Sequence, residues 1–315
     1  MDSTNLSAAL VAKSRQVVPL FLHIPKTAGT TLSNCIYQQY TNGLNVPAEV
    51  RAGRGYLCEW LREGVFYYPT GFFKPKKPVV PQWVRHALAR DDINAIIGHF
   101  PFGIHRFVPK PTTYVTLIRE PVDRVVSLYY HLTPDNITLD EFVSSLQLRE
   151  TDNDQTRRIA GLEPPFGRCT EKLLARAKDN LVRHFSVVGV AHRFEETLVL
   201  IKRALNWRDL YVRFAVLSLF DLVNRDRPPR SEIPTATVDR IAAHNRFDEE
   251  LFRFAEMLLD EAIAAQGPGF ADELQAFKAW NAQRIDRWTA RGASPPGGAQ
   301  FSKGSRRQTL GRGVE

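Results

Sequence analysis

The sequence predicts an α/β fold in which a mostly parallel sheet is flanked by helices. Short apolar runs rich in β-branched and aromatic residues alternate with stretches whose apolar residues recur at helical spacing. The runs are apolar throughout, as is typical of parallel strands buried on both faces. With 315 residues, 43% of them hydrophobic, the chain can bury one large core or two small ones. We expect one α/β domain with a tail.

The first strand is expected over residues 17–24, a run of Val, Leu, Phe and Ile that ends in His23-Ile24. A turn containing glycine follows at once. From Thr30 onward, apolar residues recur at helical spacing, at Leu32, Cys35, Ile36 and Tyr40. The first unit is therefore predicted to be strand, loop and helix.

Two further strands are expected over residues 93–98 and 114–118. The first ends in Gly98-His99 and the second in Arg119-Glu120-Pro121. Proline is well suited to the first position of a helix, and the residues after Pro121 give one apolar face. Both strands are therefore predicted to lead into polar loops.

Later elements continue the alternation. Thr138 and Glu141 have the spacing of a capping box and predict the start of a helix. A fourth strand is expected over residues 185–190, and a long helix from Phe247 to about Ala265. In such a fold, ligands bind at the carboxyl ends of the parallel strands. The three polar loops all lie at such ends.

Composition divides the chain into a flexible N-terminus at 1–16, a domain at 17–285 and a disordered basic tail at 286–315. Within the domain, residues 46–90 are a mixture of Gly, Pro and aromatic residues, which we interpret as an insertion near the acceptor site. Residues 291–315 hold five basic residues against one acidic, half of the net charge of +8. The modest remainder suits a small anionic ligand at least as well as a nucleic acid, so no nucleic acid is expected.

The sequence contains no stretch approaching the roughly 20 apolar residues that span a bilayer. Residues 1–16 lack the charged start and apolar centre of a signal peptide, so a cytoplasmic protein is expected. The three cysteines are far apart, which predicts buried free thiols rather than disulfides or a metal site. The sequence does not indicate which oligomeric state the protein adopts.

The first polar loop, residues 23–31, has the sequence His-Ile-Pro-Lys-Thr-Ala-Gly-Thr-Thr. Small residues let the backbone approach an anion, and the start of the following helix offers free N–H groups. A Walker A loop requires a lysine directly after its last glycine, whereas Lys26 precedes Gly29. The order argues against an ordinary nucleoside triphosphatase.

This loop closely resembles the 5′-phosphosulfate loop of the sulfotransferases, particularly their carbohydrate-type and bacterial members. The resemblance implies a P-loop-like sulfotransferase fold and the donor 3′-phosphoadenosine 5′-phosphosulfate (PAPS), with no metal. It also implies that Lys26 contacts the oxygen bridging sulfur and phosphorus. The remaining donor-binding residues of this loop would be Thr27, Ala28, Gly29, Thr30 and Thr31.

The second loop resembles the family's 3′-phosphate motif, in which an arginine and a serine eight residues later bind that phosphate. Arg119 and Ser127 match it. The arginine closes a strand and the serine lies about two turns into a helix, so both can face one phosphate. Arg124 is expected to pair with Asp123 or Glu120 rather than with the donor.

The third loop carries His99, which matches the Gly-His pair that holds the catalytic base in heparan-type and related bacterial sulfotransferases. A base that titrates near neutral pH would help to deprotonate an acceptor hydroxyl. His23 is expected to be a packing residue or to support a residue of the site without contacting the ligand. His105 and His131 are candidates to line the site, or else ordinary structural histidines.

Residues 152–161 are similar to an Asn-x-x-Thr-Arg segment of bacterial relatives. Arg157 and Asn153 are candidate acceptor ligands, but a capped helix start explains these polar residues almost as well. Aromatic residues of the insertion and its flank could stack on a sugar or could belong to the core. They are Trp60, Tyr67, Tyr68 and Trp83.

The sequence therefore predicts a PAPS-dependent sulfotransferase that transfers a sulfuryl group to a hydroxyl, with a carbohydrate expected as acceptor. Two alternatives are kept. One is a nucleotide-dependent phosphotransferase, which would need the missing Walker order. The other is a non-catalytic module that binds an anionic glycan or nucleic acid through residues 74–77 and the basic tail.

Overall fold

A computed structural model describes residues 17–41, 61–62, 64–68, 80–132, 137–207 and 229–289. In these segments a six-stranded sheet has the order β2-β3-β4-β1-β5-β6. Five of the strands are parallel, and only β2, at one edge, runs antiparallel to its neighbour β3. The strand bounds are Leu61–Arg62 for β2, Val65–Tyr68 for β3, Ala95–Gly98 for β4, Val18–Leu22 for β1, Thr112–Ile118 for β5 and Phe185–Val190 for β6.

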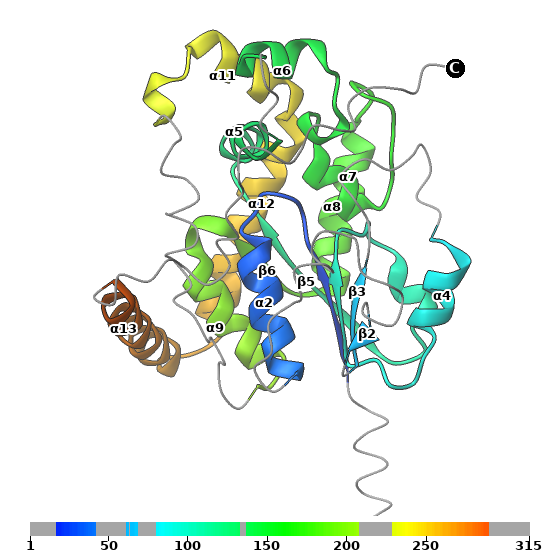
Figure 1. Ribbon diagram of the computed structural model, residues 1–315, viewed down its shortest axis with the longest axis vertical. Coiled ribbons are helices and arrows are strands. Elements are labelled where there is room, and N and C mark those ends of the chain that lie inside the picture. The colour runs from blue at the N-terminus through cyan, green and yellow to red at the C-terminus, as the bar shows by residue number, and fades with distance from the viewer. Residues whose placement is uncertain are drawn as a thin grey trace, which may run out of the picture.

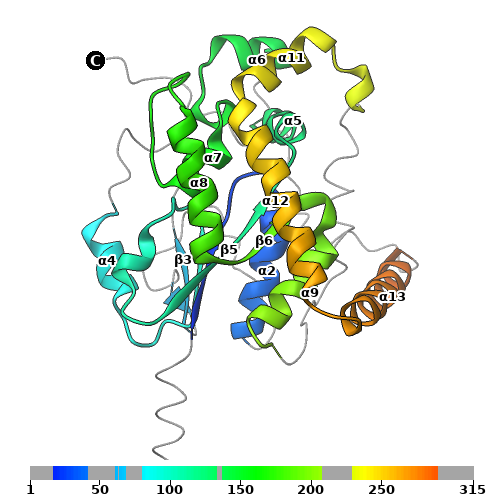
Figure 2. The same ribbon diagram turned by 180° about the vertical axis from the view of Figure 1, so that it is seen from behind.

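Helices flank this sheet, which confirms the predicted fold class (Figures 1 and 2). The helix α2, which follows β1, and the helix α8, which precedes β6, lie on opposite faces. The long helix α12 packs against both β6 and α8. The α-helices are α2 (Gly29–Tyr40), α4 (Gln82–Leu88), α5 (Pro121–Leu132), α6 (Leu139–Ser145), α7 (Asp154–Ala160), α8 (Glu171–His184), α9 (Phe194–Ala204), α11 (Thr235–His244), α12 (Arg246–Ala264) and α13 (Gly269–Thr289).

The central strand β1 is buried along its whole length between β4 and β5. Its last residue, Leu22, is in register with both Gly98 of β4 and Thr116 of β5. Because parallel strands in register end at the same edge, the loops after these three strands emerge side by side. The sheet thus brings together three loops that are far apart in the sequence.

A second apolar cluster lies beyond these carboxyl ends, where α5, α6 and α11 meet (Figure 1). The capping box that begins α6 is present as predicted. Thr138 Oγ1 accepts a hydrogen bond from the backbone N–H of Glu141, whose carboxylate accepts one from the N–H of Thr138. The cluster holds α5 above the sheet through its valine stripe.

The region expected to be an insertion, residues 46–90, contributes β3 to the sheet. Its residues 65–68 pair in parallel with β4, so this part belongs to the core fold. Only four residues long and flanked by Gly and aromatic residues, the strand has too short a pattern to be recognised in the sequence. Tyr67 and Tyr68 are buried, as the core alternative predicts, whereas Trp83 on α4 is 41% exposed. Residues 46–60, which include Trp60, and residues 63 and 69–79 lie outside the described residues.

The helix α13 was not predicted from the sequence. It extends to Thr289, so residues 286–289 form its last turn rather than the start of a tail. Residues 1–16 and 290–315 lie outside the described part of the chain. Cys35 is buried and Cys169 partly exposed, and both are free thiols. Among the described helices, none is long and apolar enough to cross a bilayer.

Candidate donor and acceptor site

The three predicted loops meet at one edge of the sheet. His99 Nδ1, after β4, lies 2.9 Å from the carbonyl oxygen of His23, at the end of β1. Arg119 Nη1, after β5, donates a 3.2 Å hydrogen bond to the carbonyl oxygen of Lys26. The loop after β1 therefore contacts the loops after β4 and β5, because β1 lies between these two strands in the sheet.

The loop after β1 is tightly folded. Lys26 and Ala28 have φ angles of 71° and 67°, in the left-handed region that residues with a side chain seldom adopt. The buried hydroxyl of Thr27 donates a 2.9 Å hydrogen bond to the carbonyl oxygen of Ile24 and so closes the turn. The chain thus reverses sharply and enters α2 at Gly29.

The start of α2 suits an anion. Ala28, at the N-cap, provides no side-chain hydrogen bond, and the first turn contains no acidic residue. Free N–H groups at a helix start carry partial positive charge and attract phosphate or sulfate groups. Lys26, two residues before this N-cap, adds a full positive charge to the loop. Its charge also helps to lower the pKa of His99.

Gly29 is required by close packing. A Cβ atom at this position would lie 1.8 Å from Cδ2 and 2.0 Å from Nε2 of His23, far inside van der Waals contact. The buried His23 ring stacks on Phe21 and lies 4.2 Å, centroid to centroid, from the ring of His99. His23 thus packs between the loop glycine and His99, which agrees with the packing role predicted for it.

The hydrogen bond to His23 fixes the tautomer of His99. A carbonyl oxygen can only accept, so Nδ1 carries the proton and Nε2 is left as a proton acceptor. Burial lowers the pKa of His99 to about 4, helped by the charge of Arg158 and opposed by the His23 carbonyl and by Asp154. The imidazole is therefore neutral at neutral pH and able to accept a proton. It is a weaker base than the near-neutral one expected from the sequence, because burial disfavours its charged form.

Ser127 lies on α5, six residues after its first residue, and is buried. It is three residues from Arg124, so both share one helix face. Arg124 Nη1 donates to the carbonyl oxygen of Pro25 at 3.2 Å, which shows that this face looks toward the first loop. Ser127 thus lies on the face of α5 nearest the first loop, and its contact with the 3′-phosphate stays a prediction.

The partner predicted for Arg124 was wrong. Neither Asp123 nor Glu120 pairs with it in the described contacts; its fully buried guanidinium lies 3.4 Å from Asp154, on α7. The carboxylate of Glu120 instead accepts a 2.6 Å hydrogen bond from the backbone N–H of Asp123 and forms an ion pair with Arg230 at 3.4 Å. An arginine that is fully buried needs a buried counter-charge, and only the tertiary fold supplies one here.

Arg157 and Asn153 have their polar atoms engaged inside the protein. The guanidinium of Arg157 is fully buried and is bonded to Asp152 and to the carbonyl oxygens of Pro164 and Pro165. The side chain of Asn153 accepts from the backbone N–H groups of Phe247 and Asp248 and so caps α12. These contacts favour the alternative in which the segment is structural. They give no support to acceptor contacts by either residue.

His105 packs against aromatic residues, including Phe102 of the third loop, whose ring centroid lies 5.2 Å from that of His105. Its Nδ1 lies 3.0 Å from the hydroxyl of Tyr114, and its ring stacks on His184. Tyr114 is four residues before the carboxyl end of β5, about 13 Å along the strand. The described contacts of His105 are therefore those of an aromatic packing group.

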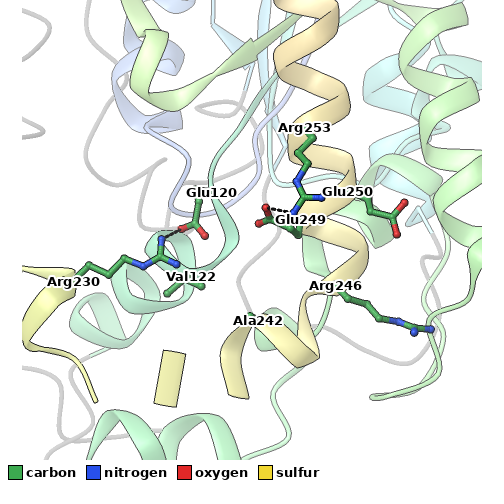
Figure 3. A pocket seen from close by; sticks show the side chains of 8 residues that line it. All are labelled: Glu120, Val122, Arg230, Ala242, Arg246, Glu249, Glu250 and Arg253. Atoms are coloured by element: carbon green, nitrogen blue, oxygen red, sulfur yellow. Dashed lines mark hydrogen bonds and ion pairs between the residues drawn. The ribbon is translucent and has the colours of Figure 1, made fainter. Parts of the chain in front are cut away.

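A cavity of about 600 Å³ opens beside the second loop, between α5, α11 and α12 (Figure 3). Its lining combines three arginines with three glutamates, several of which pair with one another. Arg230 points toward Glu120, and Arg253 lies 3.0 Å from Glu249. Mixed charges of this kind favour neither a purely anionic nor a purely cationic ligand. The lining residues are Glu120, Val122, Arg230, Ala242, Arg246, Glu249, Glu250 and Arg253.

Sequence comparisons give a consistent picture. Galactose-3-O-sulfotransferase 2 from Homo sapiens is 24% identical over 208 residues, covering 60% of this chain and 48% of its own length. Heparan sulfate 2-O-sulfotransferase 1 from Cricetulus griseus is 25% identical over 234 residues, covering 65% and 59%. Heparan-sulfate 6-O-sulfotransferase 1 from Homo sapiens is 25% identical over 292 residues, covering 78% and 66%.

The chain resembles the carbohydrate sulfotransferases. This similarity is weak in identity but recurs across three kinds of carbohydrate sulfotransferase, in agreement with the resemblance noted from the loops. The first two relatives are matched over 48% and 59% of their own lengths. No family model matches the chain.

Sequence reasoning missed several residues that shape the site. Gln155, Asp154 and Arg158 lie in the segment singled out for its polar residues, yet all three are buried. A run of polar residues is ordinarily assigned to the surface. The signal available was the similarity of the segment to bacterial sulfotransferases, which indicated importance without indicating burial.

Proposed function

We propose that this protein is a sulfotransferase that transfers a sulfuryl group from PAPS to a hydroxyl of a carbohydrate. The observation that carries the proposal is the meeting of the three loops after β4, β1 and β5 at one sheet edge. The resemblance to carbohydrate sulfotransferases supports the same reading independently.

The donor set of the first loop fits a phosphosulfate. An uncapped helix start without acidic residues, together with the ammonium of Lys26, offers N–H donors and positive charge to an anion. Arg119, which already reaches the carbonyl of Lys26, is close enough for both loops to bind one small nucleotide. Among the described residues, no group of three or more His, Cys, Asp or Glu is placed to hold a metal ion.

Bound PAPS would supply a sulfuryl group attached to a phosphate leaving group. His99 would take the acceptor hydroxyl proton at Nε2 as the new S–O bond forms and the bond from sulfur to the phosphate oxygen breaks. Lys26 and the N–H groups of α2 would neutralise the charge that develops on the departing phosphate. Arg119 and Ser127 would hold the 3′-phosphate, so the protein's contribution is mainly positioning and charge stabilisation.

The experiment is incubation of the protein with isotopically labelled PAPS and pools of sugar acceptors. We expect labelled sulfated product with wild-type protein and none with Lys26→Ala or His99→Ala. Matched controls are Lys278→Ala on the outer face of α13 and His184→Ala at the exposed end of α8, both of which should keep activity. Wild-type turnover by His99→Ala would remove that residue from the mechanism.

Calorimetry separates the two alternatives from the proposal. A sulfotransferase should bind adenosine 3′,5′-bisphosphate, whereas a phosphotransferase should prefer ATP with Mg²⁺. A non-catalytic module should bind an anionic glycan or nucleic acid even as Lys26→Ala and lose that binding when residues 291–315 are deleted. Absence of both product formation and bisphosphate binding by the wild type would end the sulfotransferase proposal.

A further inference from the structure

The backbone of Arg119 is held by a side chain from a distant part of the chain. Gln155 Oε1 accepts a 2.9 Å hydrogen bond from the N–H of Arg119, and Gln155 Nε2 donates a 2.8 Å hydrogen bond to its carbonyl oxygen. The orientation of the amide is unambiguous, because only the oxygen can face an N–H group and only the nitrogen can face a carbonyl. Gln155 is fully buried.

This pair of bonds occurs where the sheet stops. The last paired residue of β5 is Ile118, opposite Val190 of β6, so Arg119 is the first residue beyond the ladder. The amide of Gln155 offers it one donor and one acceptor, as a neighbouring strand would. The residue from which the guanidinium extends is therefore fixed by Gln155.

Gln155 is itself held by the start of α12. The carboxylate of Asp248 accepts the backbone N–H of Gln155 at 3.1 Å and that of Thr156 at 2.7 Å. It also accepts the hydroxyl of Thr156 at 2.7 Å. All three residues are fully buried. The backbone from which the side-chain amide of Gln155 extends is therefore held rigidly.

We propose that Gln155 is a positioning residue that aims Arg119 at the 3′-phosphate of the donor and so sets the preference for a 3′-phosphorylated nucleotide. This inference rests on the proposed function. A guanidinium binds phosphate through directed N–H···O hydrogen bonds. The strength of this binding therefore depends on where the backbone places the arginine side chain. A shift of the Arg119 backbone weakens the bond to the 3′-phosphate directly. It reaches the first loop through the carbonyl oxygen of Lys26, so binding of the 5′ end should change much less.

The test compares two ligands that differ only in the 3′-phosphate. Calorimetry of wild-type protein and of Gln155→Met measures the Kd of adenosine 3′,5′-bisphosphate and of adenosine 5′-monophosphate. Methionine keeps the length of the side chain but removes both hydrogen bonds to Arg119. We expect the preference for the bisphosphate to fall about tenfold, which corresponds to about one lost hydrogen bond to a charged group. The Kd of the monophosphate should stay within about twofold.

The matched control is Asn180→Leu. Asn180 is also a buried amide, and it donates a 2.8 Å hydrogen bond to the carbonyl oxygen of Ile159 at the other end of α7. A purely structural effect of losing an amide from this region would lower thermal stability in both variants. Only Gln155→Met should change the ratio of the two dissociation constants.

Failure of the positioning role and failure of the proposed function give different results in this test. An unchanged ratio in folded Gln155→Met overturns the positioning role. A wild type that shows no preference for the bisphosphate contradicts the proposed function itself. If Gln155→Met does not fold, Gln155→Glu takes its place, because it keeps the volume and the acceptor for the N–H of Arg119. The introduced carboxylate cannot donate a hydrogen bond to the carbonyl oxygen of Arg119. An unchanged ratio of the two dissociation constants in Gln155→Glu would therefore count equally against the positioning role.

Discussion

His99 illustrates how single residues determine the chemistry of this edge of the sheet. Its proton is fixed on Nδ1 by one backbone carbonyl, that of His23, and its basicity is reduced by burial and by the charge of Arg158. The sequence indicated the residue, because a histidine follows a strand in a familiar Gly-His pair. The tautomer and the direction of the pKa shift follow from neighbours about 60 to 80 residues away.

The pH dependence of kcat/KM follows from this shift. A general base acts in its deprotonated form, so activity is present above the pKa of the free enzyme and is lost as the pH falls through it. With the pKa of His99 at about 4, kcat/KM should stay level from neutral pH down to about 5 and fall below that. Initial rates in overlapping buffers measure the profile. A midpoint near 6.5 would show that His99 is not desolvated as described.

Gly29→Ala tests the packing around His23. The added Cβ would lie 1.8 Å from the ring, so the ring or the loop must move. We expect a loss of about 2 kcal/mol in the free energy of unfolding, typical of overpacking, together with weaker bisphosphate binding. Chemical denaturation measures the first effect. Gly269→Ala is the matched control, since Gly269 also begins a helix and has space for a Cβ, and it should be close to neutral.

At the scale of elements, α7 connects the donor loops to the C-terminal half of the chain. Its first residue, Asp154, is fully buried and pairs with Arg124 on α5 and with Arg158 one turn along α7. Burial opposes the ionisation of Asp154, but the charges of Arg158, Arg124 and Arg149 outweigh it and hold the pKa at about 2. A helix of only seven residues thus owes its stability to tertiary ion pairs rather than to propensity.

Asp154→Asn should be strongly destabilising. It leaves Arg124 and Arg158 buried without their counter-charge, at an expected cost of about 3 kcal/mol in the free energy of unfolding at neutral pH. The matched control is Asp179→Asn, whose i,i+4 partner Arg183 is solvent-exposed, and its effect should be below about 0.5 kcal/mol. Urea denaturation measures both. Equal effects of the two variants would mean that the buried pair contributes no more than an exposed one.

Acid should also reduce the contribution of Asp154 to the free energy of unfolding. Its folded pKa lies below the unfolded value of 3.8, so its stabilisation is fully present above that value and is lost as the pH falls toward about 2. Urea denaturation between pH 5 and pH 2.5 should therefore show a steeper loss of stability for wild type than for Asp154→Asn. Parallel curves for the two proteins would contradict the lowered pKa.

In the molecule as a whole, the proposed donor site joins loops that are 93 residues apart in the sequence. The order β4-β1-β5 makes them neighbours, and the cluster of α5, α6 and α11 above the strand ends holds the second loop in place. Neither loop holds both ends of the proposed donor by itself. Variants in the two loops should therefore alter different kinetic constants.

Arg119→Ala should mainly raise the KM for PAPS, by about 10- to 100-fold, because it removes charge-assisted bonds to the 3′-phosphate in the ground and transition states alike. Lys26→Ala should instead abolish turnover, because its charge is needed most as the leaving group departs. Steady-state kinetics with varied PAPS separates the two. Arg168→Ala, at an exposed position before α8, is the control for loss of positive charge. An unchanged KM in Arg119→Ala would place the 3′-phosphate elsewhere.

Local sequence signals were enough to predict several of the elements. The four apolar strands, the capping box at Thr138 and the loop after β1 were all predicted, because each depends on residues within a few positions of one another. The fold class followed from the alternation of these elements, and the loops at the strand ends indicated where a ligand binds.

The polar residues that support the site could be recognised only in the folded chain. The partner of Arg124, the clamp of Gln155 on Arg119 and the cap of Asn153 on α12 each join residues about 30 to 95 positions apart. The same polar run would be equally compatible with a solvated surface, because burial depends on what the rest of the chain packs against it. The strand β3 was not predicted for a related reason, because this run of four residues forms a strand only through its pairing with β4.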